Sequence, residues 1–233
     1  IATKASRVRQ SAQTDVILEF GMRRCHGTES ALYGARAAII GGCNGTSNVE
    51  AEYRFNTISK GTMSHAYVMS FETEYEAFEK FAELNPDNAI VLVDTYDSIN
   101  SGMPNAIKLF KKMRDEGTLS RYGIRLDSGD LAYISKICRK MFDDEGFYDA
   151  IISASSDLDE YLISDLKAQG AKITMWGVGT KMMTGYDTPA LGAVYKLSEL
   201  TNKNGKVESK IKLSDDPVKI TNPGKKKIVR CYD

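Results

Sequence analysis

Short apolar runs alternate with amphipathic runs along most of this chain of 233 residues, and this alternation constrains the fold more than any other feature. A repeated strand–helix order predicts a parallel sheet that is covered by helices. Runs typical of buried strands occur at 16–20, 56–60, 89–94, 122–126, 149–154 and 172–176. Helical periodicity is found at 2–12, 28–41, 62–84, 104–117, 131–142 and 158–169.

The number of these units separates two parallel α/β architectures. Six units without an early GxGxxG fingerprint favour a (β/α) barrel over a dinucleotide-binding sheet, and we expect the barrel to occupy residues 1–190. From about Gly192 onward, apolar and polar residues alternate between turn sequences. Residues 191–233 are therefore predicted to form an antiparallel segment of a smaller second domain. Its strands are expected at 193–200, 206–213 and 226–233.

Charge and composition exclude several kinds of partner. The 31 basic residues balance 31 acidic residues, so no net field favours nucleic acid or an acidic membrane surface. No apolar run approaches the roughly 20 residues that a membrane span requires. The four cysteines lie far apart without a CxxC pair, which favours reduced thiols and a cytoplasmic location over disulfides or a zinc site.

Polar residues and glycines follow every predicted strand. In a parallel α/β fold the carboxyl ends of the strands meet on one side, where ligand sites collect. Helix caps and turns account for some of these residues, but polar groups at all six ends indicate a site for a polar small molecule. The segments are FGMRRCHG, KGTMSH, DTYDS, RLDSGD, SASSDLD and WGVGT.

Two of these segments carry groups that suit an anion. Gly177 and Gly179 of the GVGT turn allow backbone N–H groups to approach a phosphate closely, and Thr180 adds a hydroxyl donor. Arg23 and Arg24 are adjacent, and their guanidinium groups suit a carboxylate or a phosphate. The alternative for the arginines is a surface ion pair.

Acids and a histidine occupy three further strand ends. Asp94 follows one predicted strand, and Asp127 and Asp130 follow the next, beside Arg125. Paired acids suit sugar hydroxyls, Mg²⁺ or a cationic transition state. His65, in GTMSH, is one of two histidines, and its position leaves two interpretations, a catalytic group or a hydrogen bond within a loop.

Taken together and in chain order, nine segments resemble the nicotinate phosphoribosyltransferase family. They cover nearly the whole chain, and the combination is specific although no single segment is. The resemblance implies an irregular (β/α) barrel of the type II phosphoribosyltransferases, with a smaller α/β domain built from both chain ends. The segments are ATKASR (2–7), EFGMRRCHG (19–27), GGCNGTSNVEA (41–51), GTMSHAYVMSF (61–71), LVDTYD (92–97), GIRLDSGDL (123–131), SASSDLDE (153–160), GVGT (177–180) and KLSDDPVKITNPGKK (212–226, near the tail).

The resemblance also implies an activity in NAD biosynthesis. Family enzymes join nicotinate and phosphoribosyl pyrophosphate to give nicotinate mononucleotide and pyrophosphate, with ATP hydrolysis and Mg²⁺. His65 matches the histidine that ATP phosphorylates, while Thr62 and Arg125 match residues of the nicotinate site. Asp94 and Asp127 match acids that face ribose and magnesium.

The same resemblance completes the expected substrate site and predicts a further N-terminal region in the whole protein. Thr180 matches a contact to phosphoribosyl pyrophosphate, and the other expected substrate-binding residues are Arg23, Arg24, Ser155, Gly177 and Gly179. Relatives carry an N-terminal region that this chain, beginning at Ile1 inside a helical run, is expected to lack. That region supplies an aromatic residue that stacks on the pyridine, often across a dimer interface, so we expect a homodimer.

Three alternatives remain at this point. Nicotinamide and quinolinate phosphoribosyltransferases share the chemistry and the barrel type, although GTMSH and EFGMRR favour the nicotinate enzyme. A phosphate-binding aldolase or isomerase would require a buried lysine or a Glu or His base at a strand end, and none is evident. A metabolite-binding barrel without catalysis is the alternative outside the enzymes.

Overall fold

The structure is a computed structural model, and it describes residues 1–190, 196–211 and 221–232. The chain divides into two compact units, Ile1–Pro189 and Ala190–Asp233. That the second unit belongs to a larger domain stays a prediction.

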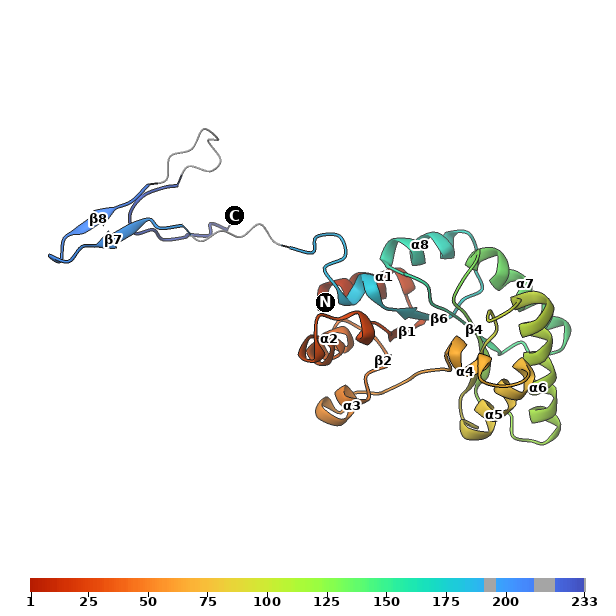
Figure 1. The fold of residues 1–233 in the computed structure, drawn as a ribbon. Helices are drawn as coiled ribbons and strands as arrows, with labels where there is room; N and C mark the ends of the chain where they lie inside the picture. The colour runs from red at the N-terminus through yellow and green to blue at the C-terminus, as the bar shows by residue number, and fades with distance from the viewer. Residues whose placement is uncertain (191–195, 212–220, 233) are drawn as a thin grey trace. The chain divides into compact units, whose positions relative to one another are not determined.

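Six parallel strands form the sheet of the first unit, in the order β2-β1-β6-β5-β4-β3. The sheet curves as a half-barrel with β2 and β3 at its edges (Figure 1). The predicted α/β fold with a parallel barrel sheet is therefore confirmed, in the form of a half-barrel. The strands are β1 (Val16–Glu19), β2 (Gly45–Thr46), β3 (Ala89–Leu92), β4 (Tyr122–Leu126), β5 (Ile151–Ala154) and β6 (Met175–Val178).

Helices cover the outer face of this sheet (Figure 1). The longer ones turn an apolar stripe toward the strands, as their periodicity predicts; α6, for example, buries Ile107, Phe110 and Met113. None of the helices that the structure describes is long and apolar enough to cross a membrane. The helices are α1 (Ala2–Ala12), η1 (Met22–Arg24), α2 (Thr28–Ile40), α3 (Val49–Phe55), α4 (His65–Met69), α5 (Glu74–Leu84), η2 (Ser98–Gly102), α6 (Met103–Asp115), α7 (Leu131–Asp144), α8 (Glu160–Ala168) and α9 (Thr180–Met183).

Successive residues of the strands point alternately into two apolar layers. Ile17 and Val91 belong to the main core between the sheet and the helices, whereas Leu18, Ile90 and Met175 pack together in a separate cluster. Burial on both faces explains why these strands are continuous apolar runs in the sequence. Polar side chains are consequently concentrated at the strand ends.

The path of the chain pairs β1 with β6, the first and last strands of the parallel sheet in chain order. After β2 the chain crosses the sheet through residues 56–64 and α4, and it begins β3 at the opposite edge (Figure 1). Strands β4, β5 and β6 then return until β6 pairs with β1, from Val16↔Met175 to Glu19↔Val178. The carboxyl ends of β1, β6, β5 and β4 therefore follow one another along one side of the sheet.

Two predicted strands differ from the observed ones. Residues 56–60 do not form a strand: Ser59 makes only an isolated bridge to Thr46, and Asn56 ends α3 in the left-handed conformation. The chain crosses the sheet there instead of joining it, and the short β2 takes the edge position. Strand β6 begins at Met175 rather than at residue 172, and it extends to Val178 over the four residues that pair with β1.

One predicted helix is divided. Residues 62–84 form α4 and α5, which are separated at 70–73. Thr73 explains the interruption, because its extended backbone and its hydroxyl, which accepts the N–H of Glu76, begin a new helix.

The second unit contains an antiparallel pair, β7 (Glu199–Thr201) and β8 (Val207–Ser209), as the alternating tail predicts. Its turn contains Gly205 at φ +78°, a left-handed conformation that glycine adopts without strain. The predicted third strand is wrong, since residues 226–232 form no strand. Parts of the predicted strands lie outside the described residues, at 193–195, 212–213 and 233.

The four cysteines are free thiols in different environments. Burial raises the pKa of the Cys43 and Cys138 thiols to about 12, and the carboxylate of Glu19 adds to the effect at Cys43. Burial also raises the pKa of the half-buried Cys25 thiol. Cys231 is exposed.

We expect alkylation of the folded protein to follow these environments, because only the thiolate reacts. A pKa raised to about 12 leaves Cys43 and Cys138 with about a thousandfold less thiolate at pH 8 than a thiol at its ordinary value of 9.0, and the fraction grows only as the pH approaches 12. Iodoacetamide labelling at pH 8 followed by peptide mass spectrometry should find Cys231 modified first. Equal rates in native and urea-unfolded protein for the two buried thiols would contradict this assignment.

Candidate active site

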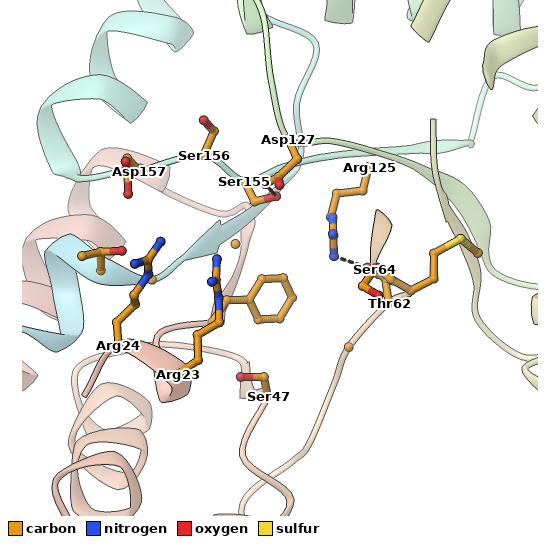
Figure 2. Close-up of a pocket in the computed structure, with 16 residues that line it drawn as sticks. Arg23, Arg24, Ser47, Thr62, Ser64, Arg125, Asp127, Ser155, Ser156 and Asp157 are labelled. Carbon is orange, nitrogen blue, oxygen red and sulfur yellow. Dashed lines mark hydrogen bonds between the residues drawn. The ribbon is translucent and has the colours of Figure 1, made fainter. Parts of the chain in front are cut away.

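A pocket of about 530 Å³ lies at the carboxyl ends of β1, β4, β5 and β6 (Figure 2). The crossing segment contributes Gly61–Ser64 to its wall, and the loop after β2 contributes Ser47. The pocket collects most of the residues that the sequence analysis assigned to a substrate site. These are Arg23, Arg24, Thr62, Arg125, Asp127, Ser155, Gly177, Gly179 and Thr180.

Arg125 is a largely buried cation at the end of β4. One terminal nitrogen, Nη1, donates a hydrogen bond to the hydroxyl of Thr62 on the crossing segment (Figure 2). Its Nε is buried and has no partner among the described residues. Burial lowers the pKa of the guanidinium, and the carboxylates of Asp127 and Asp94 oppose that shift. A guanidinium with unused donors beside a pocket is suited to bind an anion, since such contacts are strong away from water.

The two acids next to Arg125 are linked by hydrogen bonds. Asp127 accepts a hydrogen bond from the hydroxyl of Ser155 (Figure 2). Asp94 accepts from the N–H of Asp127 at 3.1 Å and from the hydroxyl of Ser128. Asp94 has a side chain that is 3% exposed, and its Oδ1 has no hydrogen-bond partner among the described residues. Asp127 therefore lines the pocket with its carboxylate held by Ser155, and Asp94 holds the backbone N–H of Asp127.

His65 lies beside this pair of acids and outside the wall of the pocket itself. Its Nε2 is 3.5 Å from Oδ2 of Asp127 and 3.8 Å from Oδ1 of Asp94, and its Nδ1 is 3.2 Å from the hydroxyl of Thr95. His65 is the first residue of α4. This helix has only five residues and the hydroxyl of Ser64 already accepts one of its amide N–H groups, so its amino end offers little to an anion.

Arg23 and Arg24 lie on η1, the short turn after β1, and both point toward the loop at 155–157 (Figure 2). Both side chains are exposed, and neither has an ion pair or hydrogen bond with another described residue. The alternative of a structural surface ion pair therefore has no partner in the described part of the chain. Two free guanidinium groups beside a pocket are available for a phosphorylated ligand.

Gly177 has a packing role in addition to its place in the pocket wall. It lies within β6, and a Cβ atom at this position would come within 2.5 Å of Cδ2 in the ring of Phe20. Glycine is required there because the ring occupies the space of a side chain, and the contact of its backbone to an anion stays a prediction. Gly179 and Thr180, at the start of α9, line the pocket beyond this contact.

Sequence reasoning did not identify three groups of the pocket, Phe20, Ser47 and the pair Ser156–Asp157. The position of Phe20 at the end of an apolar strand is indistinguishable from that of a core residue, and its face is a wall suited to a planar ring. Ser156 and Asp157 have φ values of +102° and +44°. No pattern in the sequence signals these left-handed conformations, although both residues fall in the SASSDLD segment.

The described residues contain no group of three or more His, Cys, Asp and Glu side chains arranged to hold a metal ion. Mg²⁺ in phosphate chemistry requires less, because it keeps several waters and binds through one or two carboxylates together with the phosphates of the substrate. Asp127 faces the pocket, and Asp94 has a buried oxygen without a partner. These two acids fit a substrate-borne Mg²⁺ and would not hold a resident ion alone.

These features define a parallel α/β half-barrel protein with a pocket at its strand ends that is lined by three arginines and suits an anionic small molecule. The chain belongs to the nicotinate phosphoribosyltransferase (NAPRTase) family, whose sequence pattern it matches over residues 16–230. It is 55% identical to nicotinate phosphoribosyltransferase of Bacillus subtilis (strain 168) over 233 residues, which are 100% of this chain and 47% of that protein. The chain thus spans about half the length of this curated relative.

Solved structures resemble the fold of this chain as well. The crystal structure of human nicotinic acid phosphoribosyltransferase superimposes with a TM-score of 0.70 at 24% identity, covering 76% of this chain and 46% of that one. Nicotinate-nucleotide pyrophosphorylase from Pyrococcus furiosus gives a TM-score of 0.66 at 26% identity, covering 78% of this chain and 46% of that one.

The contact between Gly177 and Phe20 generates a prediction about stability. Gly177→Ala should lower the free energy of unfolding by about 1–3 kcal/mol, because the new methyl group overlaps the ring. In a Phe20→Ala background the same change should cost less than about 1 kcal/mol, since the ring is gone. Urea unfolding of the four proteins measures this coupling. Gly61→Ala is the matched control, because nothing lies within 4 Å of its Cβ position, and equal costs in both backgrounds would contradict the contact.

Proposed function

We propose that the protein containing this chain transfers a phosphoribosyl group from phosphoribosyl pyrophosphate to the ring nitrogen of nicotinate. The observation that carries the proposal is that one pocket combines the buried guanidinium of Arg125 with two free arginines, Arg23 and Arg24. The buried group suits a small carboxylate, and the free pair suits phosphates. Membership in the nicotinate phosphoribosyltransferase family supports this assignment over the nicotinamide and quinolinate enzymes.

Nicotinate is assigned to the side of the pocket where Arg125, Thr62 and Phe20 lie. Thr62 holds one donor of the guanidinium in place, which leaves other donors for the carboxylate of the substrate. The ring of Phe20 offers an apolar face against which a pyridine can stack. We assign the second aromatic contact to the pyridine to a residue outside this chain, contributed across the interface of a homodimer.

Transfer breaks the bond between C1′ of the ribose and a pyrophosphate oxygen and forms a bond between C1′ and the pyridine nitrogen. Positive charge develops on the ribose ring while negative charge develops on the departing pyrophosphate. The carboxylate of Asp127, oriented by Ser155, is placed to stabilise the ribose, and the free arginines would stabilise the leaving group. The pyridine nitrogen attacks with its own lone pair, so no general base is required.

Mg²⁺ is assigned to the phosphates of the substrate, with Asp127 and Asp94 as the residues that would hold it. Bound there, the ion would neutralise charge on the departing pyrophosphate. The residues of the chain set the position of these phosphates relative to the ribose.

ATP is assigned to His65, which would accept its γ-phosphoryl group on a ring nitrogen with release of ADP. Oxygens of Asp127, Asp94 and Thr95 surround the imidazole and fix its orientation. Subsequent loss of the phosphoryl group to water would couple ATP hydrolysis to transfer, provided that the two states bind the substrates differently. The role of such a cycle is to drive a step of NAD biosynthesis in the cytoplasm.

Replacing Arg125 tests the nicotinate site. Arg125→Ala in the full-length protein should lower kcat/KM for nicotinate about 30- to 1,000-fold, because losing a charge-assisted contact to a buried anion costs about 2–4 kcal/mol. Arg121→Ala is the matched control, since Arg121 precedes the same strand at its amino end and does not line this pocket. Steady-state kinetics with nicotinate, nicotinamide and quinolinate as competing acceptors provides the measurement, and an unchanged value for Arg125→Ala would remove this residue from the site.

Replacing His65 tests the coupling to ATP. His65→Asn should abolish ATP hydrolysis and the acid-labile label transferred from γ-labelled ATP, while slow transfer without ATP persists because the substrate pocket remains. His26→Asn should behave as wild type, since His26 is exposed and does not line the pocket. Full stimulation by ATP in the His65 variant, or wild-type protein that takes up no label, would return His65 to a structural role.

A further inference from the structure

Glu19, the last residue of β1, has a fully buried carboxylate whose two oxygens are both hydrogen-bonded. Oε1 accepts the backbone N–H of Gly21, and Oε2 accepts the hydroxyl of Thr46. Removing a carboxylate from water is costly. Burial accordingly raises the pKa of Glu19, and the two hydrogen bonds oppose that shift. The catalytic scheme above gives this acid no task, since Glu19 does not line the pocket.

The first hydrogen bond fixes the turn that carries the two free arginines. Gly21 is the residue that opens η1, and its carbonyl accepts the N–H of Arg24 at 2.8 Å. Gly21 is also confined by its surroundings, because a Cβ atom there would come within 2.5 Å of the side chain of Met183. The carboxylate of Glu19 therefore sets the starting point of the backbone from which Arg23 and Arg24 extend.

The second hydrogen bond fixes the loop after β2. The hydroxyl of Thr46 that donates to Glu19 also accepts the N–H of Asn48 at 3.0 Å. Between them lies Ser47, which lines the pocket and donates its N–H to the backbone carbonyl of Glu19 at 2.8 Å. Strand β2 has only two residues and lies at the edge of the sheet, so its ladder alone holds this loop weakly.

We propose that Glu19 is a positioning residue for the phosphate end of the pocket, tying the turn of Arg23 and Arg24 to the loop of Ser47 through one carboxylate. This inference rests on the proposed function, and it assigns the arginines and the serine to phosphoribosyl pyrophosphate. Holding these groups before the substrate arrives lowers the entropy lost on binding. The nicotinate end depends on it less, because the backbone of Phe20 is held separately by a hydrogen bond of 2.8 Å to Val178.

Four variants of the full-length protein separate positioning from stability. Glu19→Ala removes both hydrogen bonds, and Thr46→Val removes one of them. Glu19→Gln keeps an oxygen that can accept the N–H of Gly21, so it is the conservative rescue. Ser135→Ala is the matched control, since Ser135 is equally buried and its hydroxyl accepts the N–H of Lys172, in the segment that precedes the amino end of β6.

Thermal unfolding gives the Tm of each variant, and steady-state kinetics are then measured below that temperature. Glu19→Ala should raise KM for phosphoribosyl pyrophosphate about tenfold or more, which corresponds to about 1.4 kcal/mol, with less than about a threefold change in KM for nicotinate. Glu19→Gln should recover most of this loss. Ser135→Ala should lower Tm without changing either KM. A Glu19→Ala variant with wild-type KM, or a Ser135→Ala variant with the same increase, would overturn the proposal.

A second variant and a second measurement keep the test decisive. If Glu19→Ala does not fold, Thr46→Val takes its place, and an unchanged KM for phosphoribosyl pyrophosphate in that variant overturns the proposal. If wild-type protein shows no turnover, the proposed function fails, and the positioning claim is then read from amide hydrogen exchange. Exchange at 20–25 and 45–48 should be faster in the variant of Glu19 or Thr46 than in Ser135→Ala, and equal exchange overturns the claim.

Discussion

The parallel pairing of β1 with β6 is the interaction on which the pocket depends. It joins the first strand of the sheet to the last, over the register Val16↔Met175 to Glu19↔Val178. Through this pairing the turn after β1, which carries Arg23 and Arg24, meets the GVGT residues at the end of β6. The loop at 155–157, after β5, lies beside them in the wall of the pocket. The pairing also fixes Phe20, whose N–H continues the ladder to Val178. Without it, the strands β3 to β6 would carry only half of the lining residues.

Burial of both faces of the sheet then decides where charge can lie. Apolar layers fill the two sides of the strands, so polar side chains are tolerated only where a strand ends and solvent or a hydrogen-bond partner is within reach. Arg125 and Glu19 occupy such positions with opposite charges and different surroundings. The guanidinium keeps an unsatisfied nitrogen beside the pocket, whereas the carboxylate is saturated by donors from two loops. The first group is available to a ligand, and the second is committed to the protein.

Much of this arrangement could be predicted from sequence because it follows from periodicity. Apolar strands such as 89–94 and amphipathic helices such as 131–142 depend on local pattern, and strand-end polarity indicated the site. The prediction of a strand at 56–60 was wrong because the β-branched pair Thr57–Ile58, in a segment that crosses the sheet, looks like a strand when the edge of the sheet is unknown. The packing of Gly177 against Phe20 was not predicted, because a glycine that leaves space for a ring and one that leaves space for a phosphate are identical in sequence.

The left-handed backbone at Ser156 has a consequence for engineering the thermal stability of this protein. A serine at φ +102° stores conformational energy of about 1–3 kcal/mol, in a loop that lines the pocket beside Arg24. Substitutions selected only for heat resistance will tend to relieve such a position first, since relaxing it gains more than repacking a full core. Ser156→Gly relieves it with the loop in place, because glycine adopts this φ without strain. Any other substitution that lets the residue leave this conformation changes the loop, and tolerance to heat is then obtained at the expense of the geometry of the pocket.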